Sequence, residues 1–216
     1  MWEQKVQPLV KEVHLCVNLV LKKDTQLEFS ELDLHPDLLD GIEALNYTTA
    51  TPIQEQAIPL ILAGRDIVGV AQTGTGKTAA FVLPVLNQIL ESGEQGFTQA
   101  LIIVPTRELA VQIDKVVEAY SYYTGISSMA IYGGVDGKGF AQEKTAITEG
   151  TDIIIATPGR LIAHINLGYV NFQDLRFLVL DEADRMMDMG FMPDVERILS
   201  LLTGRRQTLL FSATMP

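Results

Sequence analysis

The stretch of the sequence best suited to chemistry is Gly74-Thr75-Gly76-Lys77-Thr78, which follows an apolar run and opens a segment of helical periodicity. Glycines in such a turn let backbone N–H groups point at an anion, and the start of a helix attracts negative charge. A lysine and a threonine at the end of the turn suit the outer phosphates of a nucleotide and a Mg²⁺ ion. The predicted phosphate-binding loop comprises Ala71, Gln72, Thr73, Gly74, Thr75, Gly76, Lys77 and Thr78. The alternative is a glycine-rich turn that only links a strand to a helix.

Two adjacent carboxylates, Asp181 and Glu182, stand at the end of the apolar run 177–180. One carboxylate there can hold Mg²⁺ through its water shell while its neighbour polarises an attacking water, which suits hydrolysis of a phosphoanhydride. We therefore predict Lys77, Asp181 and Glu182 as catalytic residues, with Thr78 and Asp181 as Mg²⁺ ligands, partly through water. The competing interpretation is a solvated acidic surface.

The remaining polar or glycine-rich groups also follow apolar runs directly. They are Pro105-Thr106-Arg107-Glu108, Gly133-Gly134, Thr157-Pro158-Gly159-Arg160 and Ser212-Ala213-Thr214. In open α/β sheets, ligands bind outside the carboxyl ends of the strands, so all of these groups are expected along one edge of the sheet.

The elements that position these groups alternate between strand and helix, which predicts an α/β fold with a doubly wound, mostly parallel sheet and helices on both faces. Short apolar runs with few polar interruptions predict strands covered on both faces. The predicted strands are 66–70, 100–104, 128–132, 152–155, 177–180 and 208–211. The predicted helices are 36–45, 52–62, 77–90, 107–123, 138–148, 160–165 and 193–202.

Length and composition bound the class of protein. The chain has 216 residues, 47% hydrophobic and 20% charged, which predicts one globular core. A net charge of −11 argues against a domain that grips nucleic acid through a large cationic surface. A single cysteine excludes an intrachain disulfide and favours the cytoplasm, and no run fits a signal peptide or a membrane span. Three scattered histidines and that cysteine offer no metal-ligand spacing.

Taken in order, these motifs resemble the first RecA-like domain of a DEAD-box RNA helicase. The resemblance rests on Gln-Thr-Gly-Thr-Gly-Lys-Thr, Pro-Thr-Arg-Glu-Leu-Ala, Gly-Gly, Thr-Pro-Gly-Arg, Asp-Glu-Ala-Asp and Ser-Ala-Thr, and it covers residues 29–216. It also accounts for Ala71, which stands where a generic phosphate loop has its first glycine. The resemblance implies a RecA-like phosphate-loop domain over 63–216 and an adenine-recognition region over 27–62. Residues 1–26 are an extension of unknown role.

The resemblance further implies that Gln54 contacts the adenine edge, with Tyr47 and the upstream Phe29 as supporting aromatics. The chain departs from the family at Asn46-Tyr47, where Gly-Phe is common. Gln54 has a second interpretation, because it falls where the side chain of a capping box would close the start of a helix at Thr51. The two roles are compatible, one through the side-chain carbonyl and one through the amide.

The resemblance assigns the nucleic-acid side as well. Contacts to the RNA backbone are implied for Pro105, Thr106, Arg107, Gly134, Thr157, Gly159 and Arg160. Such contacts bind phosphates and 2′-hydroxyls without reading bases, so binding is expected to be independent of sequence. The other interpretation of Arg107 is a surface residue paired with Glu108 or Asp114. Asp184, Ser212 and Thr214 are implied to couple the nucleotide state to the RNA state.

The implied activity is RNA-stimulated ATP hydrolysis that drives local unwinding of RNA duplexes, with ATP and Mg²⁺ as cofactors. The resemblance implies a second RecA-like domain that supplies arginines to the γ-phosphate. We therefore expect these residues to form the first domain alone, a monomer that binds nucleotide with little turnover. The alternative is a non-catalytic nucleotide- and RNA-binding module. A GTPase is disfavoured because no Asn-Lys-x-Asp motif is present.

Overall fold

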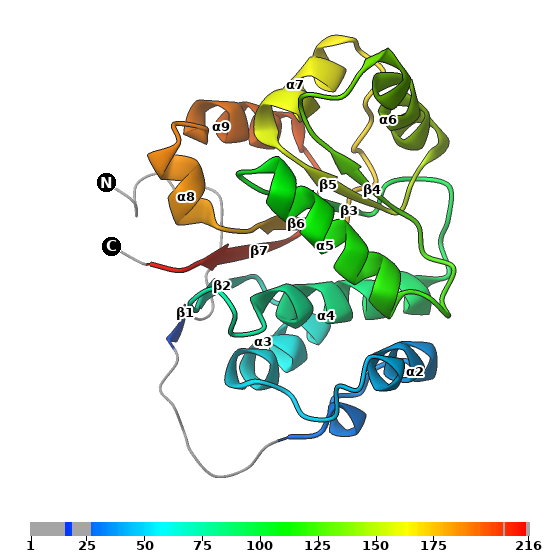
Figure 1. Cartoon of the computed structure of the whole chain (residues 1–216), viewed down its shortest axis with the longest axis vertical. Coiled ribbons are helices and arrows are strands. Elements are labelled where there is room, and N and C mark those ends of the chain that lie inside the picture. The colour runs from blue at the N-terminus through cyan, green and yellow to red at the C-terminus, as the bar shows by residue number, and fades with distance from the viewer. Residues whose placement is uncertain (1–15, 19–26, 205, 215–216) are drawn as a thin grey trace.

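A single parallel sheet organises the computed structural model, which describes residues 16–18, 27–204 and 206–214 (Figure 1). The strands are β1 (Cys16–Asn18), β2 (Ile67–Val70), β3 (Ala100–Ile103), β4 (Ser128–Ile131), β5 (Ile153–Ala156), β6 (Phe177–Leu180) and β7 (Gln207–Ser212). Their order across the sheet is β1-β2-β7-β6-β3-β5-β4, and every neighbouring pair is parallel. The predicted doubly wound α/β fold is confirmed.

Helices cover both faces of the sheet (Figure 1). The helical elements are η1 (Phe29–Glu31), α2 (Pro36–Ala44), α3 (Pro52–Leu62), α4 (Lys77–Ser92), α5 (Arg107–Tyr120), α6 (Gly137–Glu149), α7 (Pro158–Asn166), α8 (Ala183–Asp188) and α9 (Met192–Leu201). Helices α2 to α5 pack on one face and α6 to α9 on the other, because their buried residues belong to two separate apolar clusters. Residues 29–61 share the first cluster with the strands.

Alternation along the strands produces these two cores. In β3, Ala100 and Ile102 face the cluster under α4 while Leu101 and Ile103 face the other, and all four side chains are buried. Strands buried on both faces read as continuous apolar runs, which is why the sequence revealed them.

One strand pair is fitted around an aromatic ring. A Cβ atom on Gly69 in β2 would come within 2.6 Å of the Phe211 ring in β7. That ring packs against Phe81 of α4 at a centroid distance of 5.2 Å. Gly69 therefore lets the ring lie across β2 and join the sheet to α4.

All six predicted strands and all seven predicted helices are present, with ends that differ from the prediction by at most three residues. The structure adds β1, η1 and α8, which the sequence did not predict. Strand β1 comes from the N-terminal extension and pairs with β2 through Cys16–Asn18; residues 1–15 and 19–26 of that extension lie outside the described residues.

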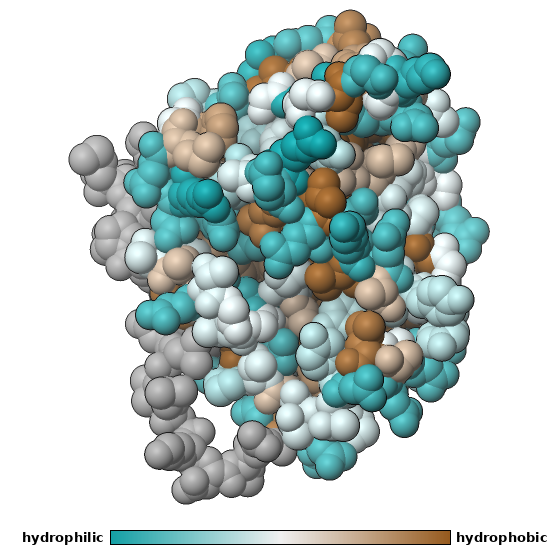
Figure 2. All heavy atoms as spheres, viewed as in Figure 1, coloured by the Kyte–Doolittle hydropathy of each residue, from teal (hydrophilic) through white to brown (hydrophobic). Residues whose placement is uncertain are grey.

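Hydrophobic residues are scattered among hydrophilic ones on the face shown in Figure 2. Within the part of the chain that the structure describes, no helix is both long enough and apolar enough to span a bilayer.

Candidate functional site

The predicted site residues follow strands at one edge of the sheet. Because the strands are parallel, the segments after their carboxyl ends share that edge. The spatial order differs from the order in the sequence. The phosphate loop after β2, the Ser-Ala-Thr segment after β7 and the acidic segment after β6 are neighbours on one half, which we call the nucleotide half. The segments after β3, β5 and β4, around Arg107, Arg160 and Gly134, are neighbours on the other, which we call the RNA half.

The phosphate loop has the backbone that anion binding requires. Gly74 and Gly76 have φ values of 86° and 93°, in the left-handed region that favours glycine, and α4 begins directly after them at Lys77. The Lys77 side chain is buried, and its Nζ has no hydrogen-bond partner among the described residues. A buried ammonium without a partner is costly, so this donor fits a phosphate group well.

Gln54 closes the start of α3 and also holds the phosphate loop. Its carbonyl oxygen accepts from the Thr51 backbone N–H at 2.8 Å, and its Nε2 donates to the Gly76 carbonyl at 3.0 Å. The predicted capping role is therefore present. The amide expected to face adenine is bound to the loop in this structure, so any contact with a base would have to share that group.

Asp181 combines burial with a nearby cation. Its side chain follows β6 and is 3% exposed. Burial raises the pKa of Asp181 to about 6, against the attraction of Lys77, which lowers it. Asp181 Oδ1 also accepts from the Glu182 backbone N–H at 2.9 Å. The carboxylate and the Lys77 ammonium thus attract each other in the interior of the nucleotide half.

Glu182 occupies a strained turn. Its φ is 51°, a left-handed value that is uncommon for a side chain of this type, and it caps the N-terminus of α8. Its Oε2 lies 3.1 Å from Arg185 Nη1, one turn along the helix. The predicted catalytic carboxylate is therefore paired with a half-exposed arginine here.

Asp184 joins the acidic segment to the end of β7. Its Oδ2 accepts from the Thr214 backbone N–H at 2.9 Å and from the Thr214 hydroxyl at 2.8 Å. Ser212 Oγ donates to the Thr214 carbonyl at 2.7 Å. Burial alone would raise the pKa of Asp184, but these hydrogen bonds outweigh it and hold the pKa below its usual value. The three residues predicted to couple the two states are thus brought together.

The two predicted aromatic supports differ in their surroundings. Phe29 is 4% exposed and packs into the core beneath η1. Tyr47 is 55% exposed, next to Asn46, whose φ of 60° lies in the left-handed region that asparagine adopts more readily than most residues. Only Tyr47 offers an open aromatic surface.

In the RNA half, Arg107 stacks on a tyrosine. Its guanidinium carbon lies 4.7 Å from the centre of the Tyr132 ring, and a Cβ atom on Gly134 would lie 3.7 Å from its Nη1. Neither Glu108 nor Asp114 pairs with it within the described ranges, so the surface ion-pair interpretation is wrong. The exposed Arg107 is free to meet a phosphate.

Helix starts fix the other predicted RNA contacts. Thr106 Oγ1 accepts from the Leu109 N–H at 3.3 Å and caps α5, while the preceding Pro105 is buried. Thr157 stands at the N-cap position of α7, which begins with Pro158, and Gly159 is exposed in its first turn. The backbone at both helix starts faces the same sheet edge as Gly134.

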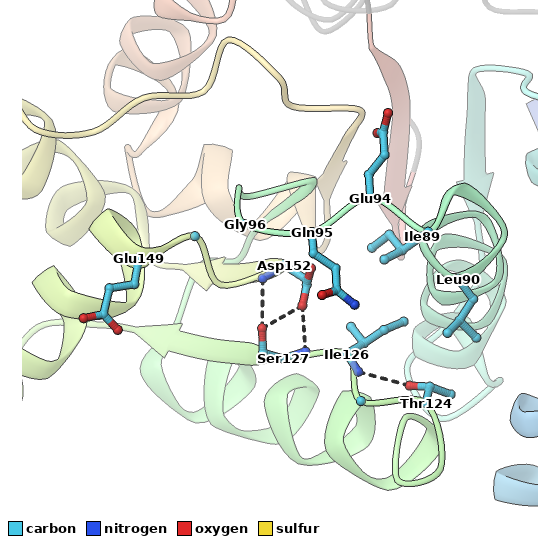
Figure 3. A pocket seen from close by; sticks show the side chains of 13 residues that line it. Ile89, Leu90, Glu94, Gln95, Gly96, Thr124, Ile126, Ser127, Glu149 and Asp152 are labelled. Carbon is cyan, nitrogen blue, oxygen red and sulfur yellow. Dashed lines mark hydrogen bonds between the residues drawn. The ribbon is translucent and has the colours of Figure 1, made fainter.

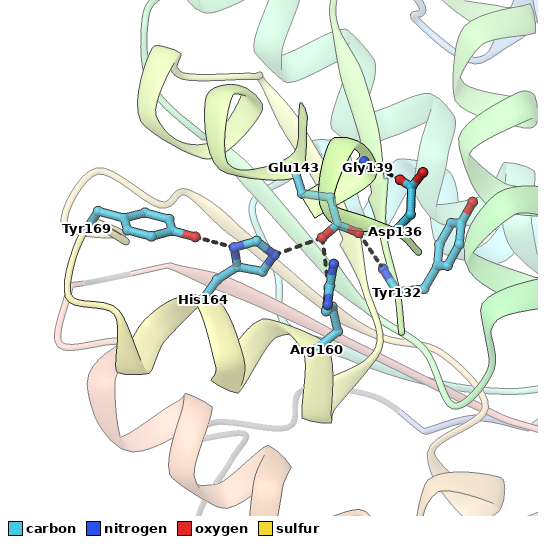
Figure 4. A network of polar contacts seen from close by, with 7 residues as sticks. All are labelled: Tyr132, Asp136, Gly139, Glu143, Arg160, His164 and Tyr169. Carbon is cyan, nitrogen blue, oxygen red and sulfur yellow. Dashed lines mark hydrogen bonds and ion pairs between the residues drawn. The ribbon is translucent and has the colours of Figure 1, made fainter. Parts of the chain in front are cut away.

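Arg160 is not a free surface cation. Its Nε donates to Glu143 Oε2 at 2.7 Å (Figure 4). Its guanidinium lies 4.5 Å from the centre of the Phe140 ring. Its Nη2 is buried and has no hydrogen-bond partner in the described part of the chain. If Arg160 contacts RNA as predicted, it does so with a guanidinium whose Nε is already bonded to Glu143.

Sequence reasoning missed Tyr132, Glu143 and His164. Glu143 and His164 are buried and hydrogen-bonded to each other at 2.9 Å. The histidine had been set aside because it lacked metal-ligand spacing. A signal was present for Glu143, which stands between Phe140 and Ile147 on the apolar stripe of a predicted helix, where a charged residue needs a partner.

A polar pocket lies at the opposite edge, among loops that precede β3, β4 and β5 (Figure 3). Its lining includes Ile126, Ser127, Glu149 and Asp152 and none of the predicted site residues. No group of three or more His, Cys, Asp or Glu side chains in the described ranges is arranged to hold a metal ion.

Comparison with known proteins gives relatives over most of the chain. The sequence profile of the DEAD/DEAH box helicase family matches residues 51–216. The chain is 47% identical over 190 residues to the DEAD-box ATP-dependent RNA helicase CshA of Streptococcus pneumoniae, a match covering 88% of this chain and 35% of that protein. It is 44% identical over 193 residues to the ATP-dependent RNA helicase vasa of Drosophila melanogaster, covering 87% and 29% respectively.

A solved structure agrees with the fold. The crystal structure of a DEAD box protein from the hyperthermophile Methanococcus jannaschii matches with a TM-score of 0.81 at 37% identity, covering 89% of this chain and 52% of that one. The chain spans about a third of the length of the curated relatives it matches. Because the profile extends over most of the chain and the solved relative shares its fold, this chain belongs to the DEAD/DEAH box helicase family.

Proposed function

We propose that this chain is the ATP-binding first RecA-like domain of an ATP-dependent RNA helicase, in which ATP hydrolysis drives local opening of RNA duplexes. The observation that carries the proposal is the division of the sheet edge. On one half stands a phosphate loop whose buried lysine Nζ has no hydrogen-bond partner among the residues the structure describes, and on the other stands the exposed Arg107, backed by an aromatic ring. Nucleotide and RNA would thus be bound side by side by loops of one sheet.

Lys77 and the loop backbone would bind the phosphates in the nucleotide half. The positive-φ glycines expose backbone N–H groups at the start of α4, and Lys77 Nζ supplies a charge-assisted donor. Glu182 would orient the attacking water as general base once Arg185 releases its carboxylate. Tyr47 and Gln54 would frame the base.

The donor set also fits Mg²⁺, which when bound would neutralise charge developing on the phosphates. The Thr78 hydroxyl follows Lys77 in the first turn of α4, and the buried Asp181 carboxylate lies near the Lys77 ammonium. Oxygen ligands of this kind, in part through water, are those that Mg²⁺ prefers.

The RNA half would bind the sugar-phosphate backbone without reading bases. Arg107 and the backbone near Thr106, Gly134, Thr157 and Gly159 would meet phosphates and 2′-hydroxyls, while Pro105 shapes the start of α5. The tie between Asp184 and Thr214 would transmit the nucleotide state across the middle of the sheet. We further propose a monomeric, cytoplasmic protein.

Efficient hydrolysis would require a second RecA-like domain that supplies arginines to the γ-phosphate. Loss of an arginine of this kind costs about 10³- to 10⁵-fold in rate in phosphoryl-transfer enzymes. The 216 residues by themselves should therefore bind nucleotide with little turnover.

Replacement of Lys77 by alanine tests the phosphate loop. The variant should bind ATP about 10- to 100-fold more weakly in isothermal titration, because a charge-assisted hydrogen bond is lost. Lys115→Ala, at an exposed lysine of α5, is the matched control and should leave affinity unchanged. If both variants bind ATP with the same affinity, Lys77 is not part of the nucleotide site. If the wild type binds GTP as tightly as ATP, Gln54 does not select the base.

A further inference from the structure

The carboxylate of Glu143 lies inside the protein and joins three elements (Figure 4). Glu143 is 3% exposed and projects from α6. Its Oε1 accepts from the Tyr132 backbone N–H, just after β4, at 3.2 Å. Its Oε2 accepts from Arg160 Nε at 2.7 Å and meets His164 Nε2 at 2.9 Å, both on α7.

The hydrogen bonds around Glu143 continue through His164 to Tyr169. His164 Nε2 is bonded to the Glu143 carboxylate, and its Nδ1 is bonded to the Tyr169 hydroxyl. Burial and the nearby Glu143 carboxylate raise the pKa of Tyr169, so its hydroxyl keeps its proton. Arg160 places a positive charge directly against the Glu143 carboxylate.

Phe140 closes the network from the side. Its ring stacks on His164 at 4.5 Å with an interplanar angle of 14°, and the Arg160 guanidinium lies 4.5 Å from its centre. Aromatic stacking restricts the histidine and the guanidinium to one orientation. Both side chains that meet Glu143 Oε2 are therefore held in place before any ligand arrives.

The two segments that Glu143 of α6 contacts carry the RNA-facing residues of the proposed function. Tyr132 immediately precedes Gly133 and Gly134, and its ring supports Arg107. Arg160 lies in the first turn of α7, directly after Thr157 and Gly159. One buried carboxylate thus contacts the backbone of the first segment and a side chain of the second.

We propose that Glu143 is a positioning residue that fixes the 132–134 loop and the start of α7, residues 157–160, at the spacing a single RNA strand requires. The inference rests on the proposed RNA-binding function. Glu143 would not touch RNA. Its effect would pass through the Tyr132 N–H, which orients the platform under Arg107, and through Arg160, whose Nη2 is left to meet a phosphate.

Removal of Glu143 should change RNA affinity in the direction opposite to that expected from net charge alone. Removal of an acidic residue from a chain of net charge −11 should strengthen RNA binding if charge alone mattered. Loss of a positioning carboxylate should weaken binding, because the contacts it organises no longer fit one strand. Glu149→Ala provides the matched control, since Glu149 is an exposed acid on the same helix.

The test compares the wild type with Glu143→Ala, Glu143→Gln and Glu149→Ala. Affinity for a fluorescein-labelled single-stranded RNA of about ten nucleotides is measured by anisotropy at low ionic strength. ADP affinity is measured in parallel, because the phosphate loop follows β2, with β7, β6, β3 and β5 between it and β4. Amide NMR signals of Gly133 and Gly134 report the first loop directly.

Glu143→Ala should weaken RNA binding about tenfold, the loss of one charge-assisted contact, while ADP affinity stays unchanged. Glu143→Gln should fall between that variant and the wild type, because its carbonyl still accepts from Tyr132 but its amide cannot accept from Arg160. Glu149→Ala should bind RNA as tightly as the wild type or more tightly.

RNA affinity of Glu143→Ala equal to that of Glu149→Ala would overturn the proposal. If Glu143→Ala fails to fold, Glu143→Gln decides: unchanged Gly133 and Gly134 signals and unchanged RNA affinity would overturn it. A wild type that binds no RNA would contradict the proposed function instead. In that case the Gly133 and Gly134 signals of Glu143→Gln still decide whether this carboxylate positions the loop.

Discussion

Burying the Asp181 carboxylate in the nucleotide half costs free energy. A carboxylate moved from water into the protein loses hydration, and the attraction of Lys77 recovers only part of that loss, so its pKa rises from 3.8 to about 6. Without a ligand, the residue therefore takes up a proton at a higher pH than an exposed aspartate does. A bound cation would reverse this preference.

Stability should fall as this carboxylate ionises. The folded-state pKa of Asp181 lies above its unfolded value, so its favourable contribution is complete below about pH 4 and is lost as the pH rises through about 6. The loss amounts to about 3 kcal/mol of unfolding free energy. Urea titrations of the wild type and Asp181→Asn between these pH values should diverge, with the variant gaining relative stability as the pH rises.

Asp184→Asn is a control of opposite sign. The pKa of Asp184 is lowered in the folded state, so its contribution is present above its usual pKa and is lost only in stronger acid. This variant should be less stable than the wild type at neutral pH, and the gap should close on acidification. Parallel curves for Asp181→Asn and the wild type would contradict the burial of an ionisable Asp181.

Between the elements, the start of α4 is locked to the start of α3. A Cβ atom on Gly76 would lie 2.5 Å from Gln54 Nε2 and 2.8 Å from Thr51 Oγ1. The helix that binds phosphate and the helix expected to frame the base thus meet at a position that only glycine can occupy.

Alanine at Gly76 should therefore cost more than alanine at Gly74. Both glycines have positive φ, so both variants pay about 1–2 kcal/mol of backbone strain. A Cβ atom on Gly74 meets nothing within 4 Å, whereas Gly76→Ala must also displace Gln54, at about 1–3 kcal/mol more. Denaturant unfolding without nucleotide measures the difference. Equal losses of unfolding free energy in the two variants would show that Gln54 moves away from residue 76 at no cost in stability.

The elements themselves were largely readable from the sequence, for reasons that residues make plain. Runs such as Ala100–Ile103 are apolar at every position, and Thr106 marks the start of α5 as a cap. Helix α8 was missed because its six residues are too few to show a period, and because the residue before it, Glu182, has a left-handed φ that no sequence rule favours.

The grouping of strand-end motifs followed from the fold class, but side-chain partners did not. The topology rule placed Asp181, Lys77 and Arg107 on one edge before any coordinates. That Arg160 pairs with Glu143, or that Gln54 Nε2 binds the phosphate loop, depends on packing between residues 17 and 22 positions apart. Periodicity and spacing carry no information on contacts of this kind.

Considered as a whole molecule, the chain is acidic but presents few cations to RNA. Among the predicted RNA contacts, the exposed Arg107 is an available guanidinium, whereas Arg160 is partly neutralised by Glu143. We therefore expect weak RNA binding with a shallow salt dependence, because each neutralised phosphate contributes a slope of about −0.7 on a double-logarithmic plot for single strands.

Anisotropy titrations over a range of salt concentrations measure this slope. The wild type should give a slope of about −1 to −2. Arg107→Ala should make the slope shallower by about 0.7, the contribution of one neutralised phosphate. A steep slope that Arg107→Ala leaves unchanged would place RNA on another surface.

The strand order has a consequence for how the molecule folds. Strand β7 comes last in sequence among the described strands, yet it lies between β2 and β6, and its pairing joins Ile67 to Leu209. During synthesis, β2 and the phosphate loop after it leave the ribosome long before β7 does, while β3 to β6 can already pair with one another. The segments after β3, β4 and β5 can therefore take their places before the phosphate loop has β7 as a neighbour.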